Sequence, residues 1–466
     1  MGTQRRFILS TLIDFGLVTH SFFGLWRSTF ESLMEVIRNT LKFIWFLALV
    51  AGNFSLWGQA PERIRIMTYN LLNYRNITSY CPSSSNNPVT KEGYLATIVD
   101  YTQPDLLICN EVNGDNATPH GRILTYSLNV NGETRWEKTD FFSNGSSLMN
   151  GIYYDQNKLG LLDQDIITKD VSNQNLVRGI DVKRFYYKDS LLYINPDTVI
   201  FTVFAAHLKA GSTASDIADR ARETAALMAY LQSHNVGNYY FLAGDLNMPK
   251  SQETGFQNLL NPSTSSIRFN DPENQPGNWN NNYTFRNLHT QSTRDGATNS
   301  GCFSGGGLDD RYDHVLFNDN VANGSGKMTY VAGSLTPVGN DGLHFNSSIN
   351  SPTNNSVPAN VLTALYEMSD HLPVYVDIDV ERLQISLDET HALPVQILGN
   401  RQDGYWVEVS QTAMGSTWRC VDLLGRTLLS GRVSSLRFPL GLPTSTGLVL
   451  FVLEPQGRLQ STLKLP

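Results

Sequence analysis

The side chains best suited to chemistry in this chain stand at the end of an apolar run. Residues 239–243 are Tyr-Tyr-Phe-Leu-Ala, and they lead directly into Gly-Asp-Leu-Asn at 244–247. Because side chains alternate along a strand, Asp245 and Asn247 point to the same side of the sheet edge. A strand that ends in this way delivers a carboxylate and an amide into one site. That pair is suited to binding a cation or a phosphate.

The same arrangement recurs at other apolar segments. The apolar patterns predict strands over 64–70, 105–111, 198–207, 239–245, 313–317 and 372–378. The polar residues at or beside the ends of these strands are Asn70, Glu111, His207, Asp313, Asp370 and His371. Hydrolysis of a phosphodiester needs a cation on the phosphate, a polarised water and stabilisation of the departing oxygen. These residue types supply that inventory, and we expect them to share one sheet edge.

Helical patterns separate the predicted strands. Residues 214–233 predict an amphipathic helix, and residues 91–101 predict a shorter one with its apolar side chains inward. The stretches 261–311 and 337–360 are rich in Asn, Gly, Ser and Pro, which predicts long surface loops. Strands and helices in this mixture favour an α/β sandwich, in which helices lie outside two packed sheets.

Six motifs, taken in order, resemble the endonuclease/exonuclease/phosphatase family, the superfamily of DNase I and the exonuclease III-type repair nucleases. The motifs are Met67-Thr-Tyr-Asn70, Asn110-Glu111, Ala206-His-Leu-Lys209, Gly244-Asp-Leu-Asn247, Tyr312-Asp313 and Ser369-Asp-His371. Each is common by chance, but six in family order are specific. The resemblance covers residues 64–380, and it implies a four-layered, DNase I-like α/β sandwich over 61–380.

The resemblance also implies a metal centre. Glu111 matches the principal metal-binding carboxylate of the family, and Asn70 completes that side of the site. Asp370 looks like a further ligand of the metal or of its water. The implied cofactor is Mg²⁺, with Mn²⁺ and Ca²⁺ as alternatives.

Further roles follow from the same resemblance. Asp245 and Asn247 match the pair that orients the nucleophilic water and contacts the scissile phosphate. His371 matches the general base or phosphate-contacting histidine, and Asp313 matches the carboxylate that orients it. His207 matches the second histidine of the DNase I branch, a general acid or a stabiliser of the transition state.

Two features near these motifs are less specific. Arg178 resembles the phosphate-contacting arginine of the family, although its context is looser. It belongs to a short basic cluster, which consists of Arg178, Lys183, Arg184 and Lys188. This cluster is either a phosphate-facing patch or an exposed hairpin. The family usually has an aromatic residue after Tyr312-Asp313, whereas this chain has His314. We expect that ring to serve packing.

Composition limits the classes of protein to consider. The chain has 466 residues, of which 41% are hydrophobic and 17% are charged, as in a soluble globular protein with more than one domain. Its net charge of −8 argues against a protein that coats nucleic acid. The four cysteines have no CxxC spacing, which disfavours a structural zinc site. Cys81 and Cys302 either pair or stay separate, and Cys109 is predicted to be a buried thiol.

The two ends of the chain indicate export. Residues 34–60 predict a signal peptide, and residues 1–33 are then an extension before the true start codon; an uncleaved membrane anchor is the alternative. Residues 383–466 predict a small all-β sandwich. This region weakly resembles the type A sorting domain of the type IX secretion system of Bacteroidetes, and a β module that binds a substrate or surface is the alternative.

These observations predict a secreted, divalent-metal-dependent phosphodiesterase of a bacterium. The leading interpretation is a nuclease whose partner and substrate is nucleic acid, with DNA favoured over RNA. After cleavage of the signal peptide, no stable membrane span is expected. Two alternatives stay open: a phospholipid phosphodiesterase of the sphingomyelinase or phosphoinositide phosphatase type, and a non-catalytic surface binding protein. Lipid-acting relatives would carry exposed apolar loops, for which the candidates here are Trp279, Phe285 and Phe303.

Overall fold

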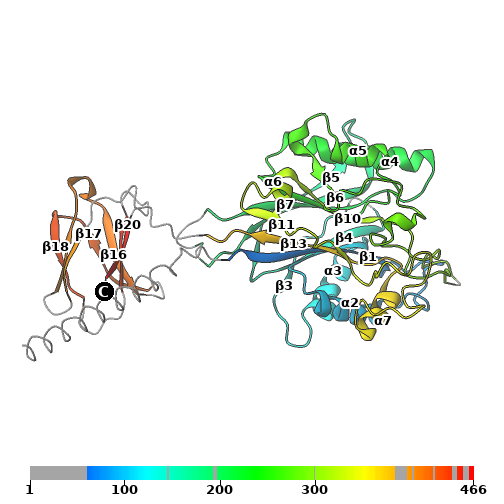
Figure 1. Cartoon of the computed structure of the whole chain (residues 1–466), viewed down its shortest axis with the longest axis horizontal. Coiled ribbons are helices and arrows are strands. Elements are labelled where there is room, and N and C mark those ends of the chain that lie inside the picture. Colours follow the sequence, from blue (N-terminus) through cyan, green and yellow to red (C-terminus); the bar gives the residue numbers. More distant parts are fainter. Residues whose placement is uncertain are drawn as a thin grey trace, which may run out of the picture. The chain divides into compact units, whose positions relative to one another are not determined.

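The computed structural model describes residues 60–143, 146–190, 192, 197–298, 300–383, 396–400, 404–422, 426–442, 449–454 and 461–465 (Figure 1). The predicted N-terminal extension over 1–33 and the predicted signal peptide, apart from Ala60, lie outside these residues. Among the described helices, none is both long enough and apolar enough to cross a membrane.

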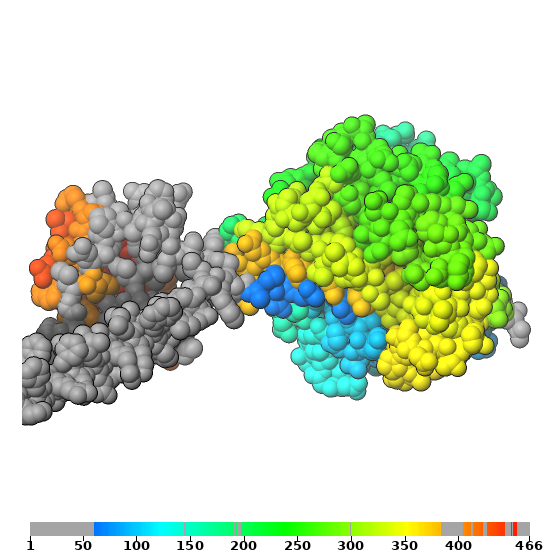
Figure 2. All heavy atoms as spheres, in the orientation of Figure 1, coloured from blue at the N-terminus to red at the C-terminus, as the bar shows by residue number. Residues whose placement is uncertain are grey.

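The first of two large sheets holds the N-terminal strand. Its strands are β1 (Glu62–Tyr74), β2 (Leu106–Asn113), β3 (Trp136–Lys138), β4 (Leu148–Asp155), β11 (Met328–Tyr330), β12 (Thr336–Pro337) and β13 (Val374–Val380). The order of the described strands is β11-β13-β1-β2-β4-β3, with β12 beside β13. β1 runs antiparallel to β13 and parallel to β2. Figure 2 shows the start of the sandwich in blue beside the orange segment that holds β13.

The second sheet holds the middle of the chain. Its strands are β5 (Leu159–Lys169), β6 (Asn175–Tyr187), β7 (Ile200–His207), β8 (Tyr239–Asp245), β9 (Phe269–Asn270) and β10 (Asp313–Asn318). Their order is β5-β6-β7-β8-β10-β9, in which only β7 and β8 run parallel. The six strands predicted from the sequence are therefore all present, divided between the two sheets.

Helices cover the outer face of each sheet (Figure 1). α2 (Pro88–Thr102) and α7 (Ala359–Met368) pack on the first sheet, and α4 (Ala214–Ser233) and α5 (Thr254–Leu260) pack on the second. Two shorter helices are α3 (Thr118–Ile123) and α6 (Asp319–Asn323). The order of layers is helix, sheet, sheet, helix. The predicted four-layered α/β sandwich is confirmed.

Apolar side chains from both sheets fill the space between them. Ile66 and Ile108 of the first sheet, with Phe201 and Phe241 of the second, are fully buried in this cluster. Burial of one side chain of this size contributes about 1.5–3 kcal/mol to stability. The packed sheets carry the polar strand ends, so this core also sets where those ends meet.

Helix prediction was accurate where periodicity was regular. α4 has the predicted bounds, and it begins with a capping box in which the side chains of Thr213 and Asp216 bond each other's backbone N–H. β5 and β6 were not among the predicted strands, although an exposed hairpin was one of the two interpretations of the basic cluster that lies on and after β6. The alternation of polar and apolar residues in β6 is interrupted by Asp181 and Lys183, which are charged and yet buried. α7 begins at Ala359, so the loop predicted over 337–360 ends two residues earlier than predicted.

The C-terminal region is built of strands, as predicted. They are β14 (Gln396–Asn400), β15 (Gly404–Glu408), β16 (Thr417–Asp422), β17 (Thr427–Arg432), β18 (Arg437–Leu440), β19 (Val449–Glu454) and β20 (Ser461–Leu465). They form two sheets, of order β14-β15-β18 and β17-β16-β19-β20. Val407, Cys420 and Phe451 are fully buried in a shared cluster. The assignment as a secretion sorting domain stays a prediction.

The structure decides between the two possibilities left open for Cys81 and Cys302. Cys81 and Cys302 form a disulfide, which joins the segment after β1 to the long loop before β10. Leu72 and Phe303 are buried with them in a small apolar cluster. Cys109 is a fully buried free thiol, as expected.

Candidate active site

The polar strand ends meet at one edge of the two sheets. The first sheet brings Asn70 on β1 and Glu111 on β2, and the second brings His207 and Asp245 at the ends of β7 and β8. Asn70 Nδ2 donates to Glu111 Oε1 at 3.2 Å and to Asp245 Oδ2 at 3.0 Å. His207 Nε2 lies 3.8 Å from Glu111 Oε1 and 3.6 Å from Asp245 Oδ2. The site therefore spans both sheets, and its geometry depends on how they pack.

A carboxylate–imidazole pair completes this group. His371 Nδ1 lies 2.7 Å from Asp313 Oδ2. Asp313 begins β10, where it is directly opposite Asp245 of β8. The second ring nitrogen of His371, Nε2, is 3.8 Å from Asp245 Oδ2. Asp313 thus fixes the orientation of the imidazole, and its outer nitrogen faces the carboxylate of Asp245.

Gln291 is a member of the site that sequence reasoning missed. Its amide nitrogen lies 2.7 Å from His371 Nε2 and 3.5 Å from Asp370 Oδ2. Its backbone forms bridges with both Asp310 and His371. Gln291 stands in the aperiodic loop over 261–311, so no sequence pattern distinguished it from its neighbours. A substrate that contacts His371 Nε2 has to displace or accommodate this amide.

Carboxylates and an amide are available for a cation. Glu111 Oε2 accepts the Asn73 N–H at 2.8 Å. Asp370 Oδ2 accepts the Ser304 N–H at 2.9 Å, while its Oδ1 is buried without a hydrogen-bond partner. Within the described part of the chain, no three His, Cys, Asp or Glu side chains cluster closely enough to hold a metal by themselves. Mg²⁺ takes one or two carboxylates and keeps several waters, so Glu111 and Asp370 fit that ion. Asn70 would have to bind it through Oδ1, which already accepts the Leu72 N–H at 2.9 Å.

Asn247 and Arg178 lie beside each other at the margin of the site. The Asn247 N–H donates to Asp245 Oδ1 at 2.9 Å, and its side chain donates to Leu208 O at 3.2 Å. Arg178 on β6 donates from Nη1 to the same carbonyl at 2.6 Å. Both side chains are half-buried, next to His207. The structure therefore brings these two predicted residues to the site, although their amide and guanidinium groups now bond the backbone.

Several residues at the strand ends have an unusual backbone. Glu111 has φ 58° and Asn247 has φ 52°, in the left-handed region that non-glycine residues rarely adopt. Gly244, just before Asp245, has φ 147°, and a Cβ there would collide with Ala206 O. Backbone conformations of this kind persist where the surrounding structure enforces them, and they cluster at functional sites. Here they turn Glu111 and Asn247 out of the regular strand alternation.

Burial and neighbouring charges separate the two histidines. For His371, burial would lower the pKa, but attraction to Asp313, the bond to it, and two further carboxylates hold the pKa well above its usual value. Burial, together with repulsion from Arg178 and His371, holds the pKa of His207 well below its usual value. Burial also raises the pKa of Asp245 to about 6, against the attraction of His371. Electrostatics therefore favour the charged form of His371 and the neutral form of His207.

Glu223, on α4 behind this site, gives a prediction on stability. Its carboxylate accepts the Lys209 N–H at 2.9 Å, and burial raises its pKa from 4.5 to about 7. Because the folded-state pKa is the higher one, this group stabilises the fold at low pH, and the contribution is lost as the pH rises through 7. Glu223→Gln should raise the free energy of unfolding by about 2–4 kcal/mol at pH 8 and by less than about 1 kcal/mol at pH 4.5. Urea unfolding at the two pH values checks this, and an equal change at both would contradict it.

Two features singled out in the sequence have structural roles. The basic cluster lies on or just after β6, and Lys183 within it is fully buried, 3.2 Å from Asp181 Oδ1. It is therefore part of a hairpin, but one that places a lysine inside the protein. His314 packs between Phe256 and Trp279, with ring centroids 5.3 Å from each, and burial lowers its pKa to about 3. The expectation that its ring serves packing is confirmed.

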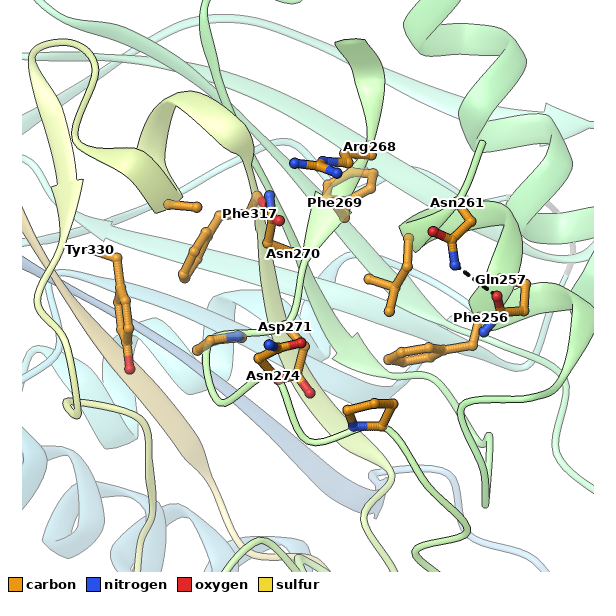
Figure 3. Close-up of a pocket in the computed structure, with 14 residues that line it drawn as sticks. Phe256, Gln257, Asn261, Arg268, Phe269, Asn270, Asp271, Asn274, Phe317 and Tyr330 are labelled. Atoms are coloured by element: carbon orange, nitrogen blue, oxygen red, sulfur yellow. Dashed lines mark hydrogen bonds between the residues drawn. The ribbon is translucent and has the colours of Figure 1, made fainter. Parts of the chain in front are cut away.

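A cavity of about 460 Å³ lies apart from these residues (Figure 3). It opens at the β9 edge of the second sheet, and its walls include Phe256, Phe269, Phe317 and Tyr330. None of its lining residues belongs to the candidate site. Asn261 donates to Gln257 across its wall at 2.8 Å, and Asp271 is paired with the buried Arg311. Its polar groups are thus largely satisfied by other protein groups.

No family model and no curated protein matches this chain. Several solved structures do. The catalytic domain of human Nocturnin with bound sulfate is 15% identical over 68% of this chain and 94% of that chain, with a TM-score of 0.42. TDP2 of D. rerio, complexed with a single-strand DNA product, is 10% identical over 68% of this chain and 100% of that chain, with a TM-score of 0.43. An endonuclease/exonuclease/phosphatase family protein from Bacteroides thetaiotaomicron is 12% identical over 68% and 95% of the two chains, with a TM-score of 0.41.

Proposed function

We propose that this protein is a secreted, divalent-metal-dependent phosphodiesterase, and specifically a nuclease that hydrolyses extracellular DNA or RNA. One observation carries the proposal. Five side chains that the sequence places at or beside the ends of different strands lie in contact at one edge of both sheets. They are Asn70, Glu111, Asp245, Asp313 and His371. A cation-binding carboxylate and amide beside a carboxylate–imidazole pair suit the attack of water on a phosphate.

The metal side of the site would consist of Glu111, Asn70 and Asp370. When bound there, Mg²⁺ would supply positive charge to the phosphate oxygens as they become more negative in the transition state. Asn70 also donates to Asp245 Oδ2, so one amide joins the metal side to the side that handles water. This amide therefore holds the metal side and the water side of the site at a fixed distance from each other.

The remaining residues act on water and phosphate. Asp245 and Asn247 orient the attacking water in line with the leaving oxygen. Charged His371, held by Asp313, donates a hydrogen bond from Nε2 to a phosphate oxygen, which is the phosphate-contacting one of its two predicted roles. When both ring nitrogens carry protons, Gln291 has to present its amide oxygen to Nε2. Neutral His207, whose Nε2 lies 3.6 Å from the same Asp245 oxygen that faces His371, stabilises the departing oxygen. Arg178 contacts the phosphate.

A phospholipid substrate is less well supported. Of the three apolar loop residues expected to reach a membrane, Trp279 and Phe303 are buried and Phe285 is half-buried against the core below α5. Leu343, Tyr283 and Ile77 are exposed, but exposed apolar residues are normal on the surface of a folded protein. A non-catalytic binding role would leave this convergent set of polar side chains without a use.

The export of the protein is part of the proposal. A disulfide between Cys81 and Cys302 is stable in an oxidising compartment, which agrees with the signal peptide predicted over 34–60. We expect the mature protein outside the cytoplasm, with a new N-terminus close to residue 61. Fractionation of the producing cells and N-terminal sequencing check this, and a cytoplasmic protein that begins at Met1 would contradict it.

The substrate is tested with the full chain on plasmid DNA, RNA and sphingomyelin vesicles in parallel, each with Mg²⁺ and with EDTA. We expect nicked plasmid that both EDTA and His371→Ala abolish. The matched control is His234→Ala, which removes an exposed histidine at the end of α4. Cleavage of sphingomyelin with intact DNA would move the assignment to a phospholipase-type enzyme. Inactivity on all three substrates would contradict the proposal.

A further inference from the structure

A line of buried polar side chains crosses the space between the two sheets next to the candidate site. Asn110 Nδ2 donates to Asn150 Oδ1 at 2.8 Å, and Asn150 Nδ2 donates to Asp181 Oδ2 at 3.1 Å. Asp181 Oδ1 is 3.2 Å from Lys183 Nζ. None of these four side chains is more than 6% exposed. We call Asn110, Asn150, Asp181 and Lys183 the inter-sheet polar chain.

The inter-sheet polar chain joins the two sheets. Asn110 on β2 and Asn150 on β4 belong to the first sheet, and Asp181 and Lys183 on β6 belong to the second. The two amides also donate to neighbouring carbonyls of β7, Asn110 to Ala206 O at 3.2 Å and Asn150 to Ala205 O at 3.1 Å. At this end of the sandwich, hydrogen bonds therefore take the place of the apolar contacts found elsewhere between the sheets.

One end of the inter-sheet polar chain reaches the candidate site. The Asp245 N–H donates to Asn110 Oδ1 at 3.1 Å. Asn110 directly precedes Glu111 on β2. The inter-sheet polar chain therefore links the strand end that carries the candidate metal ligand Glu111 to the strand end that carries Asp245.

Stability alone does not account for this arrangement. Lys183 and Asp181 form an ion pair away from water, where desolvation offsets much of the attraction between the charges. Well-packed apolar residues in place of such a pair are often equally or more stabilising. Apolar contacts, however, are not directional, whereas a run of hydrogen bonds fixes distances and angles between the groups it joins.

We propose that the inter-sheet polar chain is a positioning device that sets the distance between Glu111 and Asp245. It acts through Asn110, and Asn150 is the link on which the orientation of Asn110 depends. None of the four side chains needs to touch substrate or metal. The proposal rests on the proposed function, because it concerns how the same site is held in its working geometry.

The first test compares two buried asparagines in the full chain. Asn150→Leu breaks the inter-sheet polar chain at its centre. Asn113→Leu is the matched control, because Asn113 is also buried, lies on β2, and forms its side-chain hydrogen bonds with nearby Asp115. We expect Asn150→Leu to lower kcat by about 10–100-fold with little change in KM, as for residues that orient catalytic groups. Asn113→Leu should leave kcat near the wild-type value. Equal losses in the two variants, or a loss confined to KM, would overturn the proposal.

A second readout is independent of activity. Hydrogen–deuterium exchange of the peptide over 239–247 reports on the Asp245 amide, whose acceptor is Asn110. We expect faster exchange there in Asn150→Leu than in the wild type and in Asn113→Leu. Unchanged exchange would overturn the proposal. If the leucine variants do not fold, Asn150→Ala and Asn113→Ala are compared in the same two assays. If the wild type hydrolyses none of the substrates, the proposed function fails. The exchange comparison then still decides whether the inter-sheet polar chain positions Asp245.

Discussion

Replacing Asp245 by asparagine is expected to lower kcat for phosphodiester hydrolysis by at least about 10³-fold, as when a catalytic carboxylate is neutralised without change of shape. The carboxylate accepts hydrogen bonds from Asn70 and from the Asn247 backbone, and it faces the outer nitrogen of His371. An amide of the same size preserves the volume but removes the charge that attracts His371 and one acceptor for water. Steady-state rates at saturating Mg²⁺ measure this effect.

The same variant should not be destabilised at pH 8. Burial raises the pKa of Asp245 to about 6, so ionisation of this group in the folded state costs stability above that pH. A neutral amide avoids this cost, and we expect the melting temperature to stay the same or to rise. Activity and stability would then change in different directions, as happens where a residue is kept for function.

Asp377→Asn is the matched control for this prediction. Asp377 is also largely buried, but it lies on β13 and is bound by Arg65 at 2.7 Å. Losing its charge should lower the melting temperature and leave kcat near the wild-type value. A variant Asp245→Asn that keeps wild-type kcat, or that loses activity only in proportion to unfolded protein, would contradict the role proposed for Asp245.

Removal of divalent cations is expected to abolish hydrolysis, and Mg²⁺ should restore it. Glu111→Gln should lower kcat by about 10²–10³-fold, comparable to the loss of one group that stabilises charge in a transition state. It should also raise the Mg²⁺ concentration needed for half-maximal activity, because an amide binds Mg²⁺ more weakly than a carboxylate does. Titration of activity with Mg²⁺, and of Mn²⁺ binding by paramagnetic resonance, measures both effects.

Glu253→Gln is the matched control for the metal prediction. Glu253 is more deeply buried than Glu111, with 2% of its side chain exposed against 15%, and it is held by two hydrogen bonds from Arg220. Its replacement should lower stability without changing the dependence on Mg²⁺. Full activity of the wild type in EDTA, or an unchanged Mg²⁺ titration in Glu111→Gln, would contradict the assignment of Glu111 to the metal.

Most of the larger fold could be predicted because its strands are apolar on both faces. β2, β7 and β8 are covered by a second sheet on one side and by helices on the other, so their sequences are nearly continuous apolar runs. α4 was predicted to the residue from its periodicity, and the structure shows a capping box at its start. The strands β5 and β6 were not predicted, although a hairpin was one interpretation of the basic cluster, because the buried pair of Asp181 and Lys183 gives an inward face the appearance of an exposed one.

The residues that meet at the candidate site could also be predicted from the sequence, since Asp245, Glu111 and His371 each follow or precede an apolar strand. Residue type and position along a strand are local properties, and they determine which groups reach the sheet edge. The partners of those groups are not local. Gln291 comes to His371 from an aperiodic loop, and Asn150 reaches Asn110 from a neighbouring strand. The direction in which each histidine's pKa shifts also depends on burial and on charged groups from other segments, so only the tertiary structure decided it.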